Sequence, residues 1–400
     1  MLLEDRIAAF AGTGKLLRSL SDALKQSGNQ LHGSSHEGFI GASLDFLHAV
    51  REACRQNPWF TIPDILRAMD AIAGMLEPDC LKRWLRDYPL HPVGPVNKRK
   101  VLIIMAGNIP LVGFHDLLCV LISGHEAVVK TSSLDKRLPV ALAGLIREAE
   151  PRLGEHIRFV DGDSGNVDGD AGNVDGDARN VVGDARNVVG VAGNVDGDAG
   201  DYDAVIATGS NNSARYFDYY FGKLPHIIRK NRSSLAVIRG DESRGDLRLL
   251  GDDVFSYYGM GCRNVSQLWV PAGFDMQRLK TAWEPCRDIL DNPKYLHNYS
   301  YQKALFQVNR EPHTDLGFCL LRENPALSSP LSVVHLQVFQ SPEEPFRYAS
   351  LHREELQCVV GMEVPHELSG LAVKPGTTQQ PGPWDYADRV DTIQFLSGIS

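Results

Sequence analysis

The stretch KVLIIMAGNIPLVGFHDLLCVLISGHEAVVKTSS, residues 100–133, decides the fold of this chain. It opens with the short apolar run KVLIIMAGN, which is typical of a buried strand that ends at a Gly-Asn turn. The segment IPLVGFHDLLCVLISGH follows with helical apolar spacing and has Pro110 near its start. EAVVKTSS is again strand-like. The order strand, helix, strand predicts two parallel strands joined by a crossover helix.

The same alternation continues outward from this stretch. Toward the carboxyl end we expect a helix in DKRLPVALAGLIREAEPRL, strands in HIRFV and YDAVIATGS, and a helix in NNSARYFDYYFGK. Residues 1–97 show helical apolar spacing, as in IAAFAGTGKLLRSLSDAL. A second α/β unit begins at SLAVI and includes the apolar run LSVVHLQVF. The sequence therefore predicts an α/β protein with a doubly wound, Rossmann-like parallel sheet and a helical N-terminal segment.

Polar side chains follow three of the predicted strands. Gly107 and Asn108 follow the first, residues 130–133 end the second, and residues 209–212 follow the strand YDAVIATG. In open parallel sheets, ligands bind beyond the carboxyl ends of the strands. These clusters predict a nucleotide crevice at that edge.

The composition is that of an ordinary globular protein, with 43% hydrophobic and 23% charged residues in 400, which predicts two or three domains. No run is apolar and long enough to span a membrane, and acids at positions 4 and 5 do not fit a signal peptide, so we expect a cytoplasmic protein. Seven cysteines without a C-x-x-C pair predict reduced thiols and no metal site.

Residues 162–203 form six copies of a seven-residue repeat rich in Gly, Asp, Asn and Val. Ten Asp and two Arg give this segment a charge of −8, so the rest of the chain is close to neutral, which argues weakly against nucleic acid as a partner. Ten glycines disfavour a helix by roughly 10 kcal/mol in total. A calcium-binding solenoid is the alternative, but the repeat has neither nine residues nor a double Gly. We expect a flexible excursion whose removal leaves a short turn.

Six motifs in order resemble one known family. AGNIPLVGFHDLL, AVVKTSS, AVIATGSNNSARYF, PHIIRKNRSSLAVI, YYGMGCRNVSQLWVP and DYADRVDTIQFL are similar to the fatty-acyl-CoA reductase (LuxC-type) family of the aldehyde dehydrogenase superfamily. The resemblance implies a cofactor-binding domain over residues 1–233 and a catalytic domain over residues 234–375. It implies that residues 376–400 form a closing or oligomerising element with a terminal strand, and that the protein is a homo-oligomer. The implied reaction is NADPH-dependent reduction of an acyl-CoA or acyl-protein thioester, with a long acyl chain, to the aldehyde.

The resemblance assigns the chemistry to two residues. Cys262 in GMGCRNVSQLWV matches the nucleophile, and a thiolate that attacks a thioester forms another thioester at little free-energy cost. Asn108 matches an amide that donates to the oxyanion of the tetrahedral intermediate. The alternatives are a buried inert thiol for Cys262 and a helix-capping turn for Asn108.

The resemblance also implies a cofactor site. Lys130 matches a lysine that contacts the adenosine ribose, and Ser133 stands where enzymes that prefer NAD often carry an acid. Because Ser133 would accept a 2′-phosphate and an acid would repel it, the pair indicates NADPH. Gly209 and Ser210 match the start of a helix that faces the pyrophosphate. The alternatives are an exposed strand-end lysine and an ordinary capping turn.

The lack of an acidic residue in one stretch bears on the direction of the reaction. Aldehyde-oxidising relatives use a glutamate to activate the water that hydrolyses the acyl-enzyme, and this sequence has no acid between Arg229 and Arg239. The sequence therefore favours reduction. Two rivals remain: an aldehyde dehydrogenase acting in the oxidative direction, and a non-catalytic scaffold that uses the repeat as an interaction arm.

Overall fold

The computed structural model describes residues 1–27, 39–90, 95, 97–160 and 202–399, and these divide into two units. Unit 1 comprises residues 1–230 and 382–400, and unit 2 comprises residues 231–381. The predicted domain limits lay at residues 233/234 and 375/376. The repeat over residues 162–203 falls outside the described residues except for Tyr202 and Asp203.

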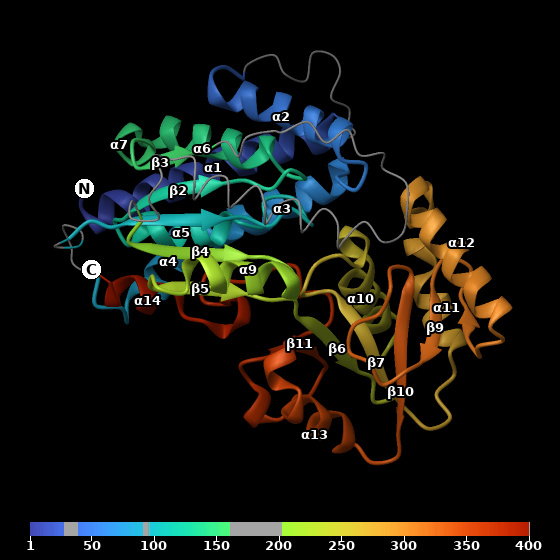
Figure 1. Cartoon of the computed structure of the whole chain (residues 1–400). Helices are drawn as coiled ribbons and strands as arrows, with labels where there is room; N and C mark the ends of the chain where they lie inside the picture. Colours follow the sequence, from blue (N-terminus) through green and yellow to red (C-terminus); the bar gives the residue numbers. More distant parts are fainter. Residues whose placement is uncertain (28–38, 91–94, 96, 161–201, 400) are drawn as a thin grey trace. The chain divides into compact units, whose positions relative to one another are not determined.

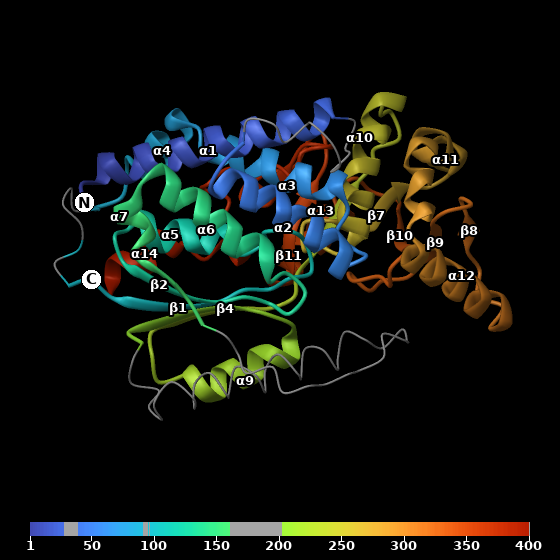
Figure 2. The same cartoon turned by 90° about the horizontal axis from the view of Figure 1, so that it is seen from above.

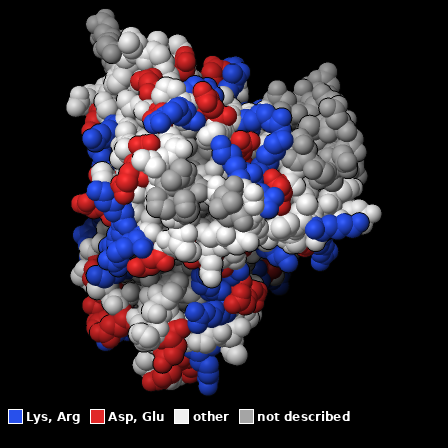
Figure 3. All heavy atoms as spheres, turned by 90° about the vertical axis from the view of Figure 1, so that its left-hand side faces the viewer, with Lys and Arg blue, Asp and Glu red and all other residues white. Residues whose placement is uncertain are grey.

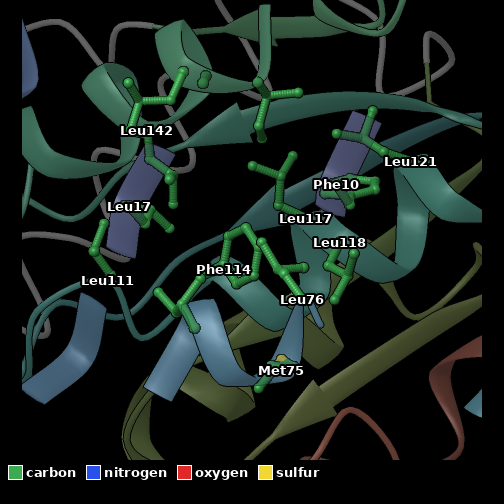
Figure 4. Packing of buried hydrophobic residues seen from close by; sticks show 14 of the residues in the cluster. Phe10, Leu17, Met75, Leu76, Leu111, Phe114, Leu117, Leu118, Leu121 and Leu142 are labelled. Atoms are coloured by element: carbon green, nitrogen blue, oxygen red, sulfur yellow. The ribbon is translucent and has the colours of Figure 1, made fainter. Parts of the chain in front are cut away.

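Unit 1 begins with four helices, as the apolar spacing of residues 1–97 predicts. They are α1 (Leu3–Gln26), α2 (Ala42–Gln56), α3 (Ile62–Met75) and α4 (Pro78–Leu85). The hydroxyl of Thr61 accepts a hydrogen bond from the Asp64 amide and caps α3. In Figure 4, Phe10 and Leu17 of α1 gather with Phe114, Leu117 and other apolar side chains in one buried cluster.

The sheet of unit 1 has five parallel strands in the order β3-β2-β1-β4-β5. The elements are β1 (Lys100–Ile104), α5 (Phe114–Ile122), β2 (Glu126–Lys130), α6 (Arg137–Ala149), α7 (Pro151–Gly154), β3 (Ile157–Phe159), β4 (Ala204–Thr208), α9 (Asn211–Phe221) and β5 (His226–Arg229) (Figure 1). The predicted alternation of strands and helices is confirmed.

Helices cover both faces of this sheet, as Figure 2 shows. Val101 and Ile103 of β1 point into the cluster that contains α5 and α6, whereas Leu102 and Ile104 pack against Phe217 of α9. Alternate side chains of one strand thus enter two apolar layers, which explains why the strand sequence is apolar throughout.

One expectation about the repeat is wrong. The repeat is flanked by β3 and β4, and a short turn was expected to remain if it were removed. These strands run parallel and are separated in the sheet by β2 and β1. Parallel strands need a crossover of about a dozen residues or more, so a short turn cannot join them.

The C-terminal residues pack onto unit 1 as helices. A 3₁₀ turn (Ala387–Arg389) leads to α14 (Thr392–Gly398), which places Ile393 and Leu396 in the unit 1 core. The Arg229 guanidinium, 2% exposed, donates to Asp116 Oδ2 at 2.8 Å and to Thr392 Oγ1 at 2.9 Å. The implied terminal strand is therefore wrong: the described residues after β12 (Ala372–Val373) contain no strand.

Unit 2 has a seven-stranded sheet in the order β12-β11-β6-β7-β10-β9-β8, parallel except for the β8–β9 pair. Its strands are β6 (Ser233–Val237), β7 (Val265–Pro271), β8 (Thr314–Asp315), β9 (Leu320–Glu323), β10 (Val333–Phe339), β11 (Leu356–Val360) and β12. Its α-helices are α10 (Arg244–Phe255), α11 (Gln277–Trp283), α12 (Pro293–Val308) and α13 (Glu344–Leu351). Its 3₁₀ helices are η3 (Ser256–Gly259), η4 (Glu284–Asp291), η5 (Arg353–Glu355) and η6 (His366–Leu368). The strands expected in SLAVI and LSVVHLQVF are β6 and β10.

Charged side chains of both signs are interspersed on the face drawn in Figure 3. Exposed ion pairs such as Arg152 with Glu150 at 2.8 Å and Arg18 with Glu77 at 2.7 Å recur over the described surface. Each such pair contributes at most about 1 kcal/mol to stability because water screens it. The fold therefore depends on its apolar layers.

Candidate active site

Unit 1 brings the predicted cofactor residues to one edge of its sheet. The strands β2, β1 and β4 are neighbours, and Ile104 pairs with Lys130 on one side and with Ala207 on the other. Their carboxyl ends therefore lie together. Gly107 and Asn108 follow β1, Lys130 ends β2 with Ser133 three residues on, and Gly209 and Ser210 follow β4.

The turn after β1 packs tightly on the turn after β2. A Cβ atom on Gly107 would lie 2.6 Å from the Ser132 Cβ and 3.1 Å from the Asp135 amide nitrogen, so only glycine fits. Asn108 is exposed in this turn. Leu111 has a left-handed φ of 58° and donates its amide to Asp135 Oδ2 at 2.8 Å. The predicted helix after Pro110 begins at Phe114 because Leu111 leaves helical geometry.

The buried Asp135 carboxyl thus shapes the turn that carries Asn108, and its ionisation is costly. Burial raises the pKa of Asp135 to about 7, although amide hydrogen bonds from Leu111 and Leu138 favour the charged form. Between the unfolded pKa of about 4 and this value, the folded state holds a proton that the unfolded state has lost. The contribution of Asp135 to the free energy of unfolding is therefore fully present below about pH 4, and it disappears as the pH rises through about 7.

We therefore expect Asp135→Asn to change the pH dependence of stability. The unfolding free energy of the wild type, minus that of Asp135→Asn, should fall as the pH rises from about 4 to 8. Urea unfolding of both proteins at half-unit pH steps measures this difference, with Asp45→Asn, at an exposed site, as the control. A difference that stays flat or rises over this range would contradict the role of Asp135.

The turn after β4 opens the 11-residue helix α9. The Ser210 hydroxyl accepts a hydrogen bond from the Ser213 amide at 3.2 Å, so Ser210 caps this helix. A Cβ atom on Gly209 would lie 2.9 Å from the Ser213 Cβ and 3.1 Å from the Phe217 ring. The helix start is thus held close to the sheet edge, and its dipole favours an anion there. Lys130 is buried and Ser133 is exposed.

Unit 2 carries the cysteine on a turn between η3 and β7. Tyr257, Tyr258 and Gly259 have left-handed φ values of 51°, 59° and 78°. Of the seven cysteines, all of which are described, Cys262 alone is exposed. Burial raises the pKa of the Cys119 and Cys319 thiols, which disfavours the thiolate that nucleophilic chemistry needs. Cys262 is therefore not buried, as the alternative interpretation required it to be.

The carboxylate of Asp253 in unit 2 accepts three hydrogen bonds. It accepts from the amides of Gly376 and Thr378 at 2.6 and 3.0 Å and from the Thr378 hydroxyl at 2.8 Å. Burial raises the pKa of Asp253. This acid fastens residues 376–378 to α10. The neighbouring strand β6 carries no acid, and its Ser234 hydroxyl donates to the Cys262 carbonyl at 2.9 Å.

Sequence reasoning missed Asp135 and the hydrogen-bonding role of Asn264. Asn264 drew notice only because it breaks a glycine fingerprint in GMGCRN. Neither role has a local signal, because their partners lie up to 24 residues away.

The described residues show neither a cluster of metal ligands nor a membrane-spanning helix. No three His, Cys, Asp or Glu side chains gather there in a way that could hold a metal ion. No helix in the described ranges is long and apolar enough to cross a membrane.

Several solved structures are similar to this chain in fold. An indole-3-acetaldehyde dehydrogenase in complex with NAD⁺ matches at 15% identity and TM-score 0.55, over 90% of this chain and 72% of that one. An NADP-dependent enzyme of E. coli matches at 13% and 0.57, over 90% and 73%. The aldehyde dehydrogenase KauB from Pseudomonas aeruginosa matches at 13% and 0.53, over 90% and 81%. No protein-family model and no curated protein matches the chain. The chain has an aldehyde-dehydrogenase-like α/β fold, as the sequence predicts.

Proposed function

We propose that this protein is an NADPH-dependent acyl-thioester reductase that forms an aldehyde through an acyl group on Cys262. The observation that carries the proposal is an exposed thiol on a tightly held turn, in a chain whose other cysteines are less exposed and whose fold is that of aldehyde dehydrogenases. The substrate is an acyl-CoA or an acyl-protein thioester, with a long acyl chain.

In the first step, the Cys262 thiolate attacks the carbonyl carbon of the thioester. The new sulfur–carbon bond forms, the bond to the leaving thiolate breaks, and the acyl group rests on Cys262. We assign the amide of Asn108 and the backbone N–H of Cys262 as donors to the oxyanion that develops in this step. Asn108 is exposed on its turn, which suits a group that must meet a substrate.

The residues at the sheet edge of unit 1 fit a dinucleotide. Gly107 and Gly209 keep the backbone of two turns free of side chains, and α9 begins there with its N-terminus. We assign Lys130 and Ser133 to the adenosine ribose and its 2′-phosphate, and Gly209 and Ser210 to the pyrophosphate. NADPH, when bound, supplies the hydride that reduces the acyl group to the aldehyde and so restores the Cys262 thiolate.

The role of Ser133 gives a prediction about cofactor choice. Replacing Ser133 by Asp places a negative charge where the 2′-phosphate of NADPH would lie, whereas Ser133→Asn is a neutral control of nearly the same size. We expect Ser133→Asp to lower the ratio of kcat/KM for NADPH to that for NADH by about tenfold or more, equivalent to about 1.4 kcal/mol. Steady-state kinetics with both cofactors measure this ratio. If Ser133→Asp and Ser133→Asn give the same ratio, Ser133 does not contact the 2′-phosphate.

The direction of the reaction follows from the acids that are present. The sequence has no acid between Arg229 and Arg239, and the buried Asp253 carboxylate holds residues 376–378 by three hydrogen bonds. With no carboxylate in this stretch to activate water, the acyl group on Cys262 should persist until it is reduced. The second candidate is oxidation of an aldehyde to an acid, which the likeness to aldehyde dehydrogenases favours.

Product analysis separates these two functions. The wild-type protein is incubated with a series of acyl-CoA chain lengths and NADPH, and the products are identified by mass spectrometry. The proposal predicts one aldehyde formed for each NADPH consumed. Acid formed from aldehyde and NADP⁺, with no reduction of any acyl-CoA, would favour the oxidative function.

A further inference from the structure

The turn that carries Cys262 has an irregular backbone that requires support. Tyr257 and Tyr258 both adopt the left-handed conformation, which costs a residue with a side chain about 1–3 kcal/mol. Such a conformation persists only where the surrounding contacts hold it. Cys262 itself is exposed, and the side chains of its neighbours contribute to the support of the turn.

One buried side chain, that of Asn264, contributes several hydrogen bonds to this support. It is 3% exposed, and its Nδ2 donates to the carbonyl oxygens of Asp253 at 3.0 Å and Ser256 at 2.9 Å. A longer contact of 3.4 Å reaches the Val254 carbonyl. Both protons of the amide are therefore used at the junction of α10 and η3, immediately before the left-handed residues.

The same amide closes the turn on its other side. The side-chain Oδ1 of Asn264 accepts a hydrogen bond from the backbone N–H of Gly261 at 2.8 Å. The backbone N–H of Asn264 donates to the Gly261 carbonyl at 3.0 Å. Residues 261 and 264 are thus joined twice, with Cys262 and Arg263 between them. Asn264 therefore connects the end of α10, η3 and the cysteine turn.

Two further hydrogen-bonding groups act on the same turn. The Ser234 hydroxyl donates to the Cys262 carbonyl at 2.9 Å and accepts from the Cys358 amide at 3.1 Å. The Arg263 Nε donates to the Thr378 carbonyl at 2.5 Å. The backbone on both sides of Cys262 is held by hydrogen bonds, while Cys262 is an exposed residue.

We propose that Asn264 is the positioning residue of the Cys262 nucleophile. It fixes the direction in which the sulfur leaves the turn, and so the approach of the sulfur to the acyl carbon. The inference rests on the proposed function. An alanine at position 264 leaves at least two buried carbonyls and one amide without their partner, at about 1–3 kcal/mol each. The turn can then relax, and a displacement of about 1 Å of a reacting atom can cost about 100-fold in rate.

The test compares Asn264→Ala with Asn292→Ala. Asn292 is also a buried asparagine of unit 2, and its Oδ1 caps α12 by accepting from the Lys294 amide at 2.9 Å. Three quantities are measured for each variant: the single-turnover rate of Cys262 acylation by acyl-CoA, the affinity for NADPH, and the melting temperature. Alkylation of Cys262 by iodoacetamide, a small reagent that needs no defined approach, gives the intrinsic reactivity of the thiol.

We expect Asn264→Ala to lower the acylation rate by about 100-fold and to lower alkylation by less than about fivefold. NADPH affinity should not change, since the residues assigned to it belong to unit 1. Asn292→Ala should lower the melting temperature with acylation within about twofold of the wild type. If Asn264→Ala does not fold, Asn264→Ser, which keeps one donor and one acceptor, carries the test with an expected loss of about tenfold.

An acylation rate in the Asn264 variant equal to that of the wild type would overturn the inference and leave the proposed function standing. An equal loss of acylation in Asn292→Ala would also overturn it, because the loss would then follow stability alone. A wild-type protein that is not acylated at all would overturn the proposed function, and this inference with it.

Discussion

Replacement of Cys262 by alanine is expected to abolish acyl-thioester reduction, with a fall in kcat of about 10⁴-fold or more. The physical reason is that no other cysteine is exposed to accept the acyl group. The other six cysteines are buried or partly buried, and burial raises the pKa of the Cys54 thiol to about 11, where the thiolate is scarce at neutral pH. The measurement is NADPH oxidation at saturating acyl-CoA, followed by absorbance.

Cys80→Ala is the matched control for this loss. Cys80 is partly buried on α4 of unit 1 and takes no part in the proposed chemistry. We expect it to keep the wild-type rate within about twofold. Activity of Cys262→Ala close to that of the wild type, with the Cys80 variant also active, would remove Cys262 from the mechanism.

The second large effect is expected at Asn108. Asn108→Ala removes one donor to the oxyanion, and loss of one such donor typically lowers kcat by about 10²–10³-fold, or about 2.7–4 kcal/mol. Because the amide acts mainly when charge develops on the carbonyl oxygen, KM should change little. Steady-state kinetics with acyl-CoA and NADPH give both constants.

Asn97→Ala is the control for Asn108. Asn97 is exposed just before β1, so it lies at the opposite end of the same strand from Asn108. We expect this variant to behave as the wild type. A rise in KM without a fall in kcat for Asn108→Ala would instead show that Asn108 holds the substrate and does not stabilise the oxyanion.

Local patterns were sufficient to predict the strands β1, β2 and β4 and the helices α5 and α9. The apolar runs that become β1, β2 and β4 are unbroken because both faces of the sheet are covered by helices. Because neighbouring strands joined by helices run parallel, their carboxyl ends lie at the same edge of the sheet. This is why Gly107, Lys130 and Gly209 could be assigned to one edge from the sequence.

Contacts between distant residues were not predictable in this way. The C-terminal residues are held on unit 1 by a hydrogen bond from Arg229 to Thr392, and Arg229 also binds Asp116. Both partners are more than 100 positions away from Arg229, and no sequence periodicity predicts such contacts. The same holds for Asp135 and Asn264, which hold turns through backbone groups. The sequence indicates a reactive cysteine, but the supports of its turn appear only when the chain is folded.

The most direct test of the account is the mass of the protein after incubation with acyl-CoA in the absence of NADPH. We predict that the protein gains the mass of one acyl group, that peptide mapping places this group on Cys262, and that it persists until NADPH is added and aldehyde appears. No adduct, an adduct on another residue, or an adduct that water removes rapidly as the free acid would contradict the account.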